Sequence, residues 1–313
     1  MKIARYVFFL VAATVLLTAS SAVAGMLVSA EWLKERLGDR SIRIVDVSNK
    51  PDTYGKGHIP GAVQVKRYLD LGNTDAVPPT LYPTREQFEQ LMSRLGIDKG
   101  TTVVAYDDTY GLFASRFLVI MEYYGHPVGK LKLLDGGSVR WKALGYSLDK
   151  DAVSVKKTKY NVRNEEIRRD MIITWSDIYR DVVNGAKPDV VLLDVRPAAE
   201  YNAKNIRSIR GGYVPKAINV TGSEANKKEE HVFKPVEEIR KMYEEKGITP
   251  DKSIYEYCHS GDRAAHAYMT LKHLLDYKNV KAYDGGWIEW STILSLPAEG
   301  QVWLWEAPPQ EKK

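Results

Sequence analysis

The sequence predicts an α/β protein in which one domain occurs twice, each copy being a mostly parallel sheet flanked by helices. Two observations predict this. Amphipathic, helix-like segments alternate with short apolar runs along the chain, which is the order typical of parallel sheets. The segments of the first half also recur in the same order about 150 residues later, a period too long for a solenoid of short repeats.

The first copy begins with a helix-like segment at 27–37, for which Ser29 is a suitable N-cap. An apolar strand follows at 42–48, and a glycine-rich turn then leads into a further short strand. The next predicted helix ends at Gly96, the residue type that most often terminates a helix. The copy closes with these predicted segments: a strand at 101–108 and an Asp-Gly-Gly segment at 133–145.

The second copy repeats this order. Its first helix opens with Thr174 and Asp177, spaced as in a capping box. Its later helix ends at Gly247, as the first copy ends one at Gly96. The remaining predicted segments follow the same plan: strands at 189–197 and 252–259, a turn and strand at 209–220, a helix at 234–248, and Asp-Gly-Gly within 282–294.

The N-terminal residues 1–24 are typical of a cleavable signal peptide. Lys2 and Arg5 precede an apolar run that is short for a membrane span, and Ala22 and Ala24 fit the small-x-small cleavage pattern. We therefore expect a periplasmic or secreted protein with no stable membrane insertion after cleavage; an uncleaved anchor is the alternative. The other predicted limits are: a non-catalytic domain at 25–150, a linker at 151–170, a catalytic domain at 171–300 and a C-terminal tail at 301–313.

The net charge of +5 is too mild to argue for nucleic-acid binding, and two of the positive charges lie in the signal segment. No basic stripe with interleaved aromatic residues is present in the sequence. It has no glycine-rich dinucleotide fingerprint and no cluster of metal-ligand residues, so neither a cofactor nor a metal is implied. The oligomeric state is not predicted.

Cys258 is the only cysteine of the chain, so it cannot form an internal disulfide or a multi-cysteine zinc site. It lies between a predicted strand and a predicted helix, where unpaired helix amides and the nearby Arg263 would stabilise a thiolate. In the first copy, Asp107 occupies the equivalent position. A catalytic nucleophile in the second copy is therefore the favoured interpretation, and a buried, inert cysteine is the alternative.

Several motifs resemble those of tandem rhodanese-type sulfurtransferases, the thiosulfate and 3-mercaptopyruvate sulfurtransferase family. The matching motifs are Gly-His-Ile-Pro-Gly-Ala at 57–62, Asp-Val-Arg at 194–196, Cys-x-x-Gly-x-Arg at 258–263 and Asp-Gly-Gly at 284–286. Tyr213 and Lys216 depart from the first of these motifs in the second copy. The resemblance implies that Cys258 accepts a sulfane sulfur as a persulfide from a small-molecule donor and passes it to a thiol or cyanide.

Six residues are predicted to bind the substrate around Cys258: Arg263, Arg196, His259, Ser260, Gly261 and Asp262. The alternative for Arg263 is a surface or helix-capping ion pair. Arg196 could instead pair with Asp194 or Glu200, and His259 could act as an acid, base or donor, or point to solvent. Asp262 would repel a doubly charged thiosulfate if it faced the pocket. The sequence does not place Arg207 and Arg210.

Two other functions compete with sulfur transfer. A Cys-dependent phosphatase needs five residues between its cysteine and arginine, whereas four separate Cys258 from Arg263. This makes a phosphatase unfavourable. A rhodanese-like carrier or binding protein for sulfur or selenium, with little turnover, stays open because the same fold supports different functions.

Overall fold

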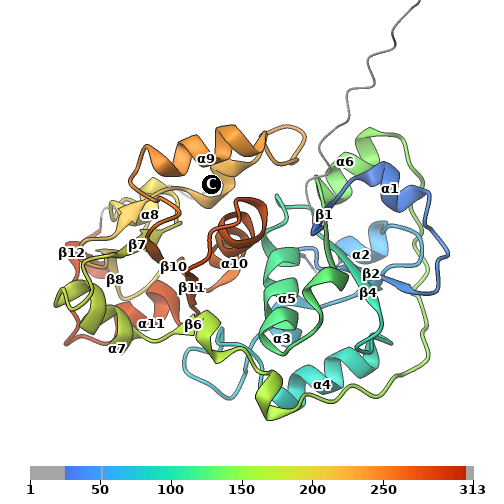
Figure 1. The fold of residues 1–313 in the computed structure, drawn as a ribbon, viewed down its shortest axis with the longest axis horizontal. Helices are drawn as coiled ribbons and strands as arrows, with labels where there is room; N and C mark the ends of the chain where they lie inside the picture. The colour runs from blue at the N-terminus through green and yellow to red at the C-terminus, as the bar shows by residue number, and fades with distance from the viewer. Residues whose placement is uncertain (1–24, 51, 308–313) are drawn as a thin grey trace, which may run out of the picture.

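The computed structural model describes residues 25–50 and 52–307 and contains one five-stranded parallel sheet in each half of the chain (Figure 1). The strand order is the same in both: β1-β5-β4-β2-β3 and β6-β11-β10-β7-β9. The predicted fold class, two α/β units with mostly parallel sheets, is confirmed. The predicted signal segment lies outside the described residues.

The first domain alternates strands and helices, as the sequence predicts. Its strands are β1 (Leu27–Val28), β2 (Ile42–Asp46), β3 (Val63–Gln64), β4 (Thr102–Tyr106) and β5 (Leu131–Leu134). Its helices are α1 (Ala30–Lys34), α2 (Thr53–Lys56), α3 (Arg67–Asp70), α4 (Arg85–Arg94), α5 (Leu112–Tyr123) and α6 (Gly137–Ala143), with a 3-10 turn η1 (Val128–Lys130).

The second domain repeats the pattern and adds an antiparallel pair, β8 with β12. Its strands are β6 (Ile172–Ile173), β7 (Val190–Asp194), β8 (Arg210–Tyr213), β9 (Ile218–Asn219), β10 (Ser253–Tyr257), β11 (Val280–Tyr283) and β12 (Glu299–Trp303). Its α-helices are α7 (Trp175–Ile178), α8 (Ala198–Tyr201), α9 (Val236–Glu244), α10 (Asp262–Tyr268) and α11 (Gly286–Thr292). The remaining helical segments are η2 (Asn164–Glu166), η3 (Arg169–Met171), η4 (Tyr179–Val183), η5 (Gly222–Ala225), η6 (Met269–Leu274) and η7 (Leu304–Glu306).

The helix ends predicted from the sequence are confirmed. The Ser29 hydroxyl accepts a hydrogen bond from the Trp32 amide at 3.1 Å. Thr174 and Asp177 form the reciprocal capping box that begins α7. Gly96 and Gly247 follow α4 and α9 with φ of +66° and +79°, the left-handed conformation that glycine adopts without strain.

Two features at the edges of the domains, the C-terminal tail and the linker, differ from or extend the predictions. The tail expected from residue 301 begins inside β12, which pairs with β8. The expected linker at 151–170 runs along the first domain, where the Ser93 hydroxyl donates to the Thr158 carbonyl at 2.6 Å (Figure 1). Within the described part of the chain, every helix is too short or too polar to cross a membrane. The domain limits themselves stay predictions.

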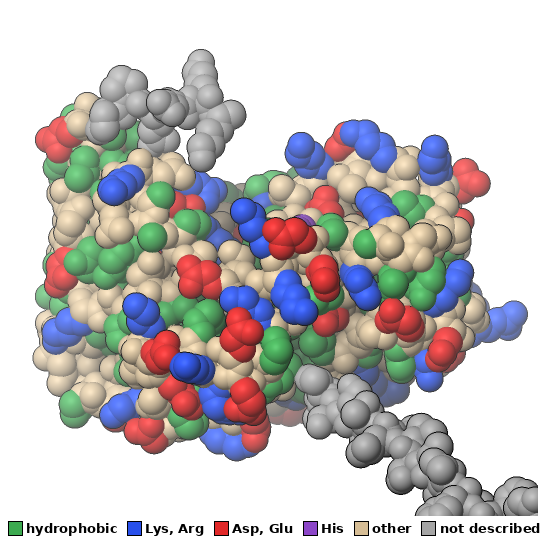
Figure 2. Space-filling model, turned by 90° about the horizontal axis from the view of Figure 1, so that it is seen from above, with side chains coloured by type: hydrophobic (Ala, Val, Ile, Leu, Met, Phe, Trp, Pro, Cys, Tyr) green, Lys and Arg blue, Asp and Glu red, His purple; other side chains and the backbone are tan. Residues whose placement is uncertain are grey.

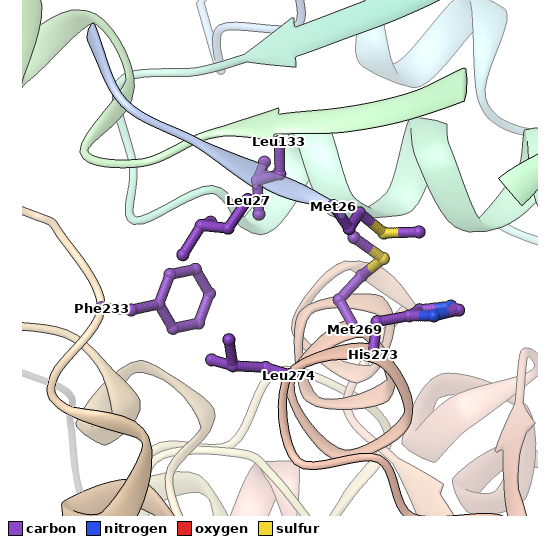
Figure 3. A pocket seen from close by; sticks show the side chains of 7 residues that line it. All are labelled: Met26, Leu27, Leu133, Phe233, Met269, His273 and Leu274. Atoms are coloured by element: carbon purple, nitrogen blue, oxygen red, sulfur yellow. The ribbon is translucent and has the colours of Figure 1, made fainter. Parts of the chain in front are cut away.

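The two domains meet along α5 and α10, which face each other at the centre of the molecule (Figure 1). One hydrophobic core cluster includes buried residues of both helices and of both domains. Beside α10, apolar side chains of the two domains enclose a cavity of about 20 Å³, with Leu27 and Leu133 opposite Phe233 and Leu274 (Figure 3). A polar contact closes the same seam, because His273 Nε2 lies 2.7 Å from a carboxylate oxygen of Glu122.

The surface carries its charges in a mixed pattern. On the face shown in Figure 2, Lys and Arg side chains are interspersed with Asp and Glu over both domains. The basic and acidic groups on this face therefore largely screen one another.

Candidate active site

The loop that holds Cys258 joins the end of β10 to the start of α10. Backbone hydrogen bonds from α11 hold this loop in place. The carbonyls of Cys258 and His259 accept hydrogen bonds from the amides of Trp287 and Ile288, at 2.8 and 3.1 Å. Gly286 passes so close that a Cβ there would lie 2.9 Å from the Cys258 carbonyl oxygen. The second Asp-Gly-Gly motif therefore clamps the loop backbone.

The Cys258 thiol lies at the N-terminal end of α10, and its sulfur accepts a hydrogen bond from the Gly261 amide at 3.1 Å. The residue is only 1% exposed. Gly261 has φ of +90°, and a Cβ there would approach the Arg116 guanidinium to 1.9 Å. Glycine is thus required at this position both for the backbone conformation and for the close approach of the first domain.

Arg263, from the first turn of α10, is oriented by Glu200 of α8. Its two Nη atoms donate to the two carboxylate oxygens of Glu200 at 2.8 and 3.1 Å, the bidentate geometry that arginine favours. Burial opposes the charge on Arg263, but the neighbouring Cys258 and Glu200 side chains outweigh it and raise the pKa of Arg263. Arg207 also donates to Glu200, at 3.1 Å, so Arg207 reaches this cluster.

Glu200→Gln is expected to lower the free energy of unfolding by about 2 kcal/mol at pH 7, because it leaves the half-buried Arg263 without its counter-charge. Burial raises the pKa of Glu200, but the hydrogen bond and charge of Arg263 and the charge of Arg207 outweigh it and lower the pKa overall. Because its pKa is lower in the folded protein, Glu200 stabilises the fold at pH values above its unfolded pKa near 4.5. This contribution is lost as the pH falls through the folded pKa. The deficit of the variant should therefore shrink in acid.

Urea unfolding at pH 7 and pH 4 measures this difference. Glu238→Gln is the matched control, since it removes only an exposed i,i+4 pair with Lys234 and should change stability by less than about 0.5 kcal/mol. Equal stability of Glu200→Gln and the parent protein at pH 7 would show that Glu200 does not hold Arg263.

His259 is buried rather than pointing to solvent, so the second of its two sequence alternatives is wrong. Burial and the charge of Arg207 lower the pKa of its imidazole to about 4, with smaller contributions from Arg263 and Arg196. The ring is therefore neutral at pH 7. Its Nδ1 is buried and has no hydrogen-bond partner among the described residues.

Arg196 and Arg210 are both engaged in the protein interior. Arg196 pairs with Asp194, with a shortest distance of 2.6 Å, and also donates to the Gly212 carbonyl, so the structure contains the ion pair that competed with substrate contact. Arg210 donates to four backbone carbonyls, two in the last turn of α11 and two in the segment that follows it. It holds that segment and takes no part in the Cys258 loop.

Ser260 and Asp262 form the side of the loop that faces the first domain. The Ser260 hydroxyl lies 3.5 Å from a carboxylate oxygen of Asp262. The Asp262 carboxylate is paired with Arg67 of α3, whose Nε donates to it at 2.9 Å and whose Nη2 donates to its other oxygen. The repulsion of anions expected from an unpaired Asp262 is therefore offset by a cation from the other domain.

The first domain contributes two arginines that sequence reasoning missed. Besides Arg67, Arg116 of α5 is buried, donates to Asp284 at 3.0 Å and lies 4.0 Å from Asp262. Arg116 had a detectable signal, because it is the only charged residue in the first ten of the otherwise apolar helix α5. Such a buried charge must find a partner. Arg67 had none, since it lies on a helix of four residues, too short to show a periodic pattern.

The equivalent loop of the first domain already contains an anion of its own. The Asp107 carboxylate accepts four backbone N–H groups, from Thr109, Gly111, Phe113 and Ala114, at 2.7–3.0 Å. Burial raises the pKa of Asp107 to about 6 against the opposing effect of these bonds. The fold therefore builds an anion-binding backbone cradle after this central strand, and only the second copy places a thiol in it.

Glu256 is a further buried group that the sequence did not single out. It lies two residues before Cys258 on β10, so the two side chains point to the same face of the sheet. Both carboxylate oxygens lack a hydrogen-bond partner among the described residues. Burial, reinforced by the Cys258 and Asp284 charges, raises the pKa of Glu256 well above its usual range. Burial therefore favours the neutral acid form of Glu256 over its carboxylate.

The described residues contain no group of side chains suited to binding a metal ion. In residues 25–50 and 52–307, no three His, Cys, Asp or Glu side chains are grouped so that they could hold an ion. The groups around Cys258 are instead arginines, amides and a neutral imidazole, which suit an anionic substrate.

Comparisons with known proteins agree with this arrangement. The chain is 33% identical to the sulfur carrier protein TtuD of Thermus thermophilus, over 88% of this chain and 97% of that protein. It superposes on SseA from Escherichia coli, a 3-mercaptopyruvate sulfotransferase, with a TM-score of 0.74, 28% identity and coverage of 84% and 99% of the two chains. An anaerobic ergothioneine biosynthesis enzyme from Chlorobium limicola gives a TM-score of 0.76 at 25% identity, over 87% of this chain and 69% of that one.

The Rhodanese-like domain family matches the sequence twice, over residues 29–144 and again over 181–293. Each matched region contains four of the five strands of its parallel sheet, and the second contains Cys258 and its loop. With the same strand order in both halves and the thiol in one of them, the chain belongs to the rhodanese family as a tandem protein of two rhodanese-like domains.

Proposed function

We propose that the protein accepts a sulfane sulfur on Cys258 and passes it to a thiol or to cyanide. The single observation that carries this proposal is the position of the only thiol of the chain. Its sulfur accepts the Gly261 amide at the N-terminal end of α10, next to the guanidinium of Arg263. An amide and a cation at this point stabilise both a thiolate and a persulfide anion.

The enzyme class follows from the family. The two Rhodanese-like domains and the likeness to SseA make the chain a sulfurtransferase. Thiosulfate and 3-mercaptopyruvate are the two donors we propose, because both are small anions that carry a transferable sulfur. The cationic side chains around the loop suit either of them.

The proposed reaction has two half-reactions. In the first, the Cys258 thiolate attacks the sulfane sulfur of the donor, and a new S–S bond forms. The bond between that sulfur and the rest of the donor breaks, and sulfite or the enolate of pyruvate leaves with the electron pair; the enolate then takes a proton from water. In the second, the acceptor attacks the terminal sulfur and the Cys258 thiolate leaves, which restores the enzyme.

The Gly261 amide and Arg263 have the positions to stabilise the negative charge in both half-reactions. Glu200 fixes the plane of the Arg263 guanidinium, and its second partner, Arg207, limits the motion of the carboxylate. His259 is neutral at pH 7, so its ring can either donate a hydrogen bond to the sulfur-donor substrate or accept one from it.

A donor screen tests the proposal. The purified protein is incubated with thiosulfate or 3-mercaptopyruvate, and mass spectrometry then looks for an added sulfur atom on the peptide that contains Cys258. Cyanide or a thiol is added next, and thiocyanate or the new persulfide is measured. The proposal fails if no donor leaves sulfur on Cys258.

A carrier with little turnover is the second candidate, favoured by the likeness to TtuD, a sulfur carrier protein. The same experiment separates the two functions. A persulfide that forms on Cys258 and persists in excess cyanide and thiol indicates a carrier that releases sulfur only to a specific partner. Repeated turnover with a small acceptor indicates the enzyme.

We also propose that the protein works outside the cytoplasm, in a periplasm or after secretion. This rests on the signal-like composition of residues 1–24, with Lys2 and Arg5 ahead of the apolar run. N-terminal sequencing of the protein from fractionated cells of its natural host should give Gly25 as the first residue. A membrane-bound protein with an intact N-terminus would identify an uncleaved anchor instead.

A further inference from the structure

We propose that the non-catalytic first domain sets the charge of the approach to Cys258 through Arg67, which makes Arg67 a specificity-determining residue for anionic reagents. For its natural substrates this inference rests on the proposed sulfur transfer. Its test does not, because the nucleophilic reactivity of Cys258 can be measured without any sulfur donor.

Arg67 is held rigidly against the catalytic loop although it belongs to the other domain. Its guanidinium binds both oxygens of Asp262, and its central carbon lies 4.2 Å from the ring centres of both Tyr68 and Phe113. The side chains of Arg67 and Asp262 are only 12% and 8% exposed. A bidentate pair that is also stacked between aromatic rings has a fixed geometry.

This ion pair forms part of the wall of a cavity of about 150 Å³ between the domains. Arg67, Tyr68 and Arg116 line it from the first domain, and Ser260 and Asp262 line it from the second. Ser260 is two residues from Cys258 in the same loop. The cavity therefore borders the catalytic loop, and we infer that small molecules approach Cys258 through it.

The charged groups around this cavity balance only when Arg67 is counted. Arg116 is already committed to Asp284 and to the carbonyls of Leu71 and Thr80. Without Arg67, the carboxylates of Asp262 and Asp284 would outnumber Arg116 and make the cavity negative. One uncompensated charge within the cavity should slow the entry of a singly charged anion by about five- to tenfold, and that of a doubly charged one by more.

Arg67 also has a donor that an anion can engage. Its Nη1 makes a hydrogen bond of 3.4 Å to Asn49, which is longer than its two hydrogen bonds to Asp262 and the easiest to exchange. We therefore expect donors of higher negative charge to depend more strongly on Arg67. Thiosulfate, a dianion, should lose more kcat/KM in an Arg67 variant than 3-mercaptopyruvate, chiefly through KM.

The test compares alkylation of Cys258 by iodoacetate, an anion, and by iodoacetamide, which is neutral. In both, the thiolate attacks the carbon that bears iodine, a C–S bond forms and iodide leaves with the electron pair. Cys258 is the only cysteine, so the mass of the intact protein reports its reaction alone. The ratio of the two rates cancels changes in thiol reactivity and isolates the effect of charge on approach.

Four proteins are compared: the parent, Arg67→Gln, Asp262→Asn and the double variant. The iodoacetate-to-iodoacetamide ratio should fall about five- to tenfold in Arg67→Gln, rise in Asp262→Asn, and return near the parent value in the double variant, which restores the charge balance. Arg94→Gln is the matched control, since it removes an arginine from an ion pair with Asp70 of the same helix α3, outside this cavity. Its ratio should equal the parent value.

The outcomes decide the proposal separately from the sulfur-transfer function. A ratio that does not change in Arg67→Gln, or rates that fall equally for both reagents in both single variants, would mean that the pair is only a structural bond between the domains. No alkylation by either reagent would also overturn the proposal, because the cavity would then not lead to Cys258. If the ratios follow the predicted order but no sulfur donor is turned over, this inference stands and the proposed sulfur-transfer function is rejected.

Discussion

Cys258→Ser is expected to lower the rate of sulfur transfer by about 10³-fold or more with every donor that the parent protein uses. The serine oxygen can still accept the Gly261 amide, so the loop should keep its conformation. A hydroxyl is a far weaker nucleophile toward sulfur, and His259 Nδ1 makes no hydrogen bond within the described chain that would mark it as a base for residue 258. Steady-state rates with thiosulfate and with 3-mercaptopyruvate measure the effect.

The loss should come from the missing sulfur and not from misfolding. Cys258→Ala, which removes the hydrogen bond as well as the nucleophile, should be as inactive as Cys258→Ser. Both variants should unfold within about 1 kcal/mol of the parent, because the replaced side chain is small. Activity retained in the serine variant would remove Cys258 from the mechanism and favour a non-covalent role for the loop.

Glu256→Met is expected to raise the free energy of unfolding by about 1–3 kcal/mol at pH 8. The two side chains have similar lengths, and the Glu256 carboxyl is fully buried with both oxygens unpaired among the described residues. A buried polar group without partners costs free energy, and methionine removes that cost while filling the same space.

The gain should depend on pH in a defined direction. Burial raises the pKa of Glu256 well above its unfolded value near 4.5, so the folded protein keeps a proton that the unfolded chain loses as pH rises. Stability of the parent protein therefore falls as pH increases above about 4.5 until the folded pKa is reached. The advantage of Glu256→Met should be small near pH 4.5 and largest at pH 8.

Urea unfolding at pH 5 and pH 8 measures this effect, with Glu237→Met as control. The Glu237 side chain is 86% exposed, so its replacement should change stability by no more than about 0.5 kcal/mol at either pH. A Glu256→Met protein that is less stable than the parent at both pH values would show that the carboxyl has a partner in solution.

The raised pKa of Glu256 also has a consequence for the site. A carboxylate on the same strand face as Cys258 would oppose a thiolate through the low-dielectric interior. Burial raises the pKa of Glu256 and so disfavours a second negative charge beside the sulfur. Glu256→Met should therefore change the reactivity of Cys258 at pH 8 much less than it changes stability.

The sequence predicted the fold because its signals are local. Ser29, Thr174 and the glycines at 96 and 247 mark helix ends by interactions within a few residues, and all four were placed correctly. The repeat of about 150 residues gave the two domains, since equivalent strands occur in the same order in each. The antiparallel β8–β12 pair was not predicted, because its strands are far apart in the chain and β12 is polar and exposed.

The candidate site was predictable only along the loop itself. Cys258 and Arg263 stand out because a lone thiol, a glycine and an arginine precede a helix, and this spacing is visible in the sequence. The partners of the loop are not visible there. Glu200 precedes Arg263 by 63 residues, and Arg67 precedes Asp262 by 195, so nothing local connects them.

By itself, the sequence determined the duplicated α/β architecture, the position of the single thiol and the glycine on which its loop turns. Only the tertiary structure decided which charges surround that thiol. It paired Arg196 with Asp194, left His259 buried and neutral, and brought Arg67 from the first domain onto Asp262. The physical reason is that local propensity and periodicity act over a few residues, whereas the electrostatics of a buried site depend on every charge that folding brings within a few ångströms.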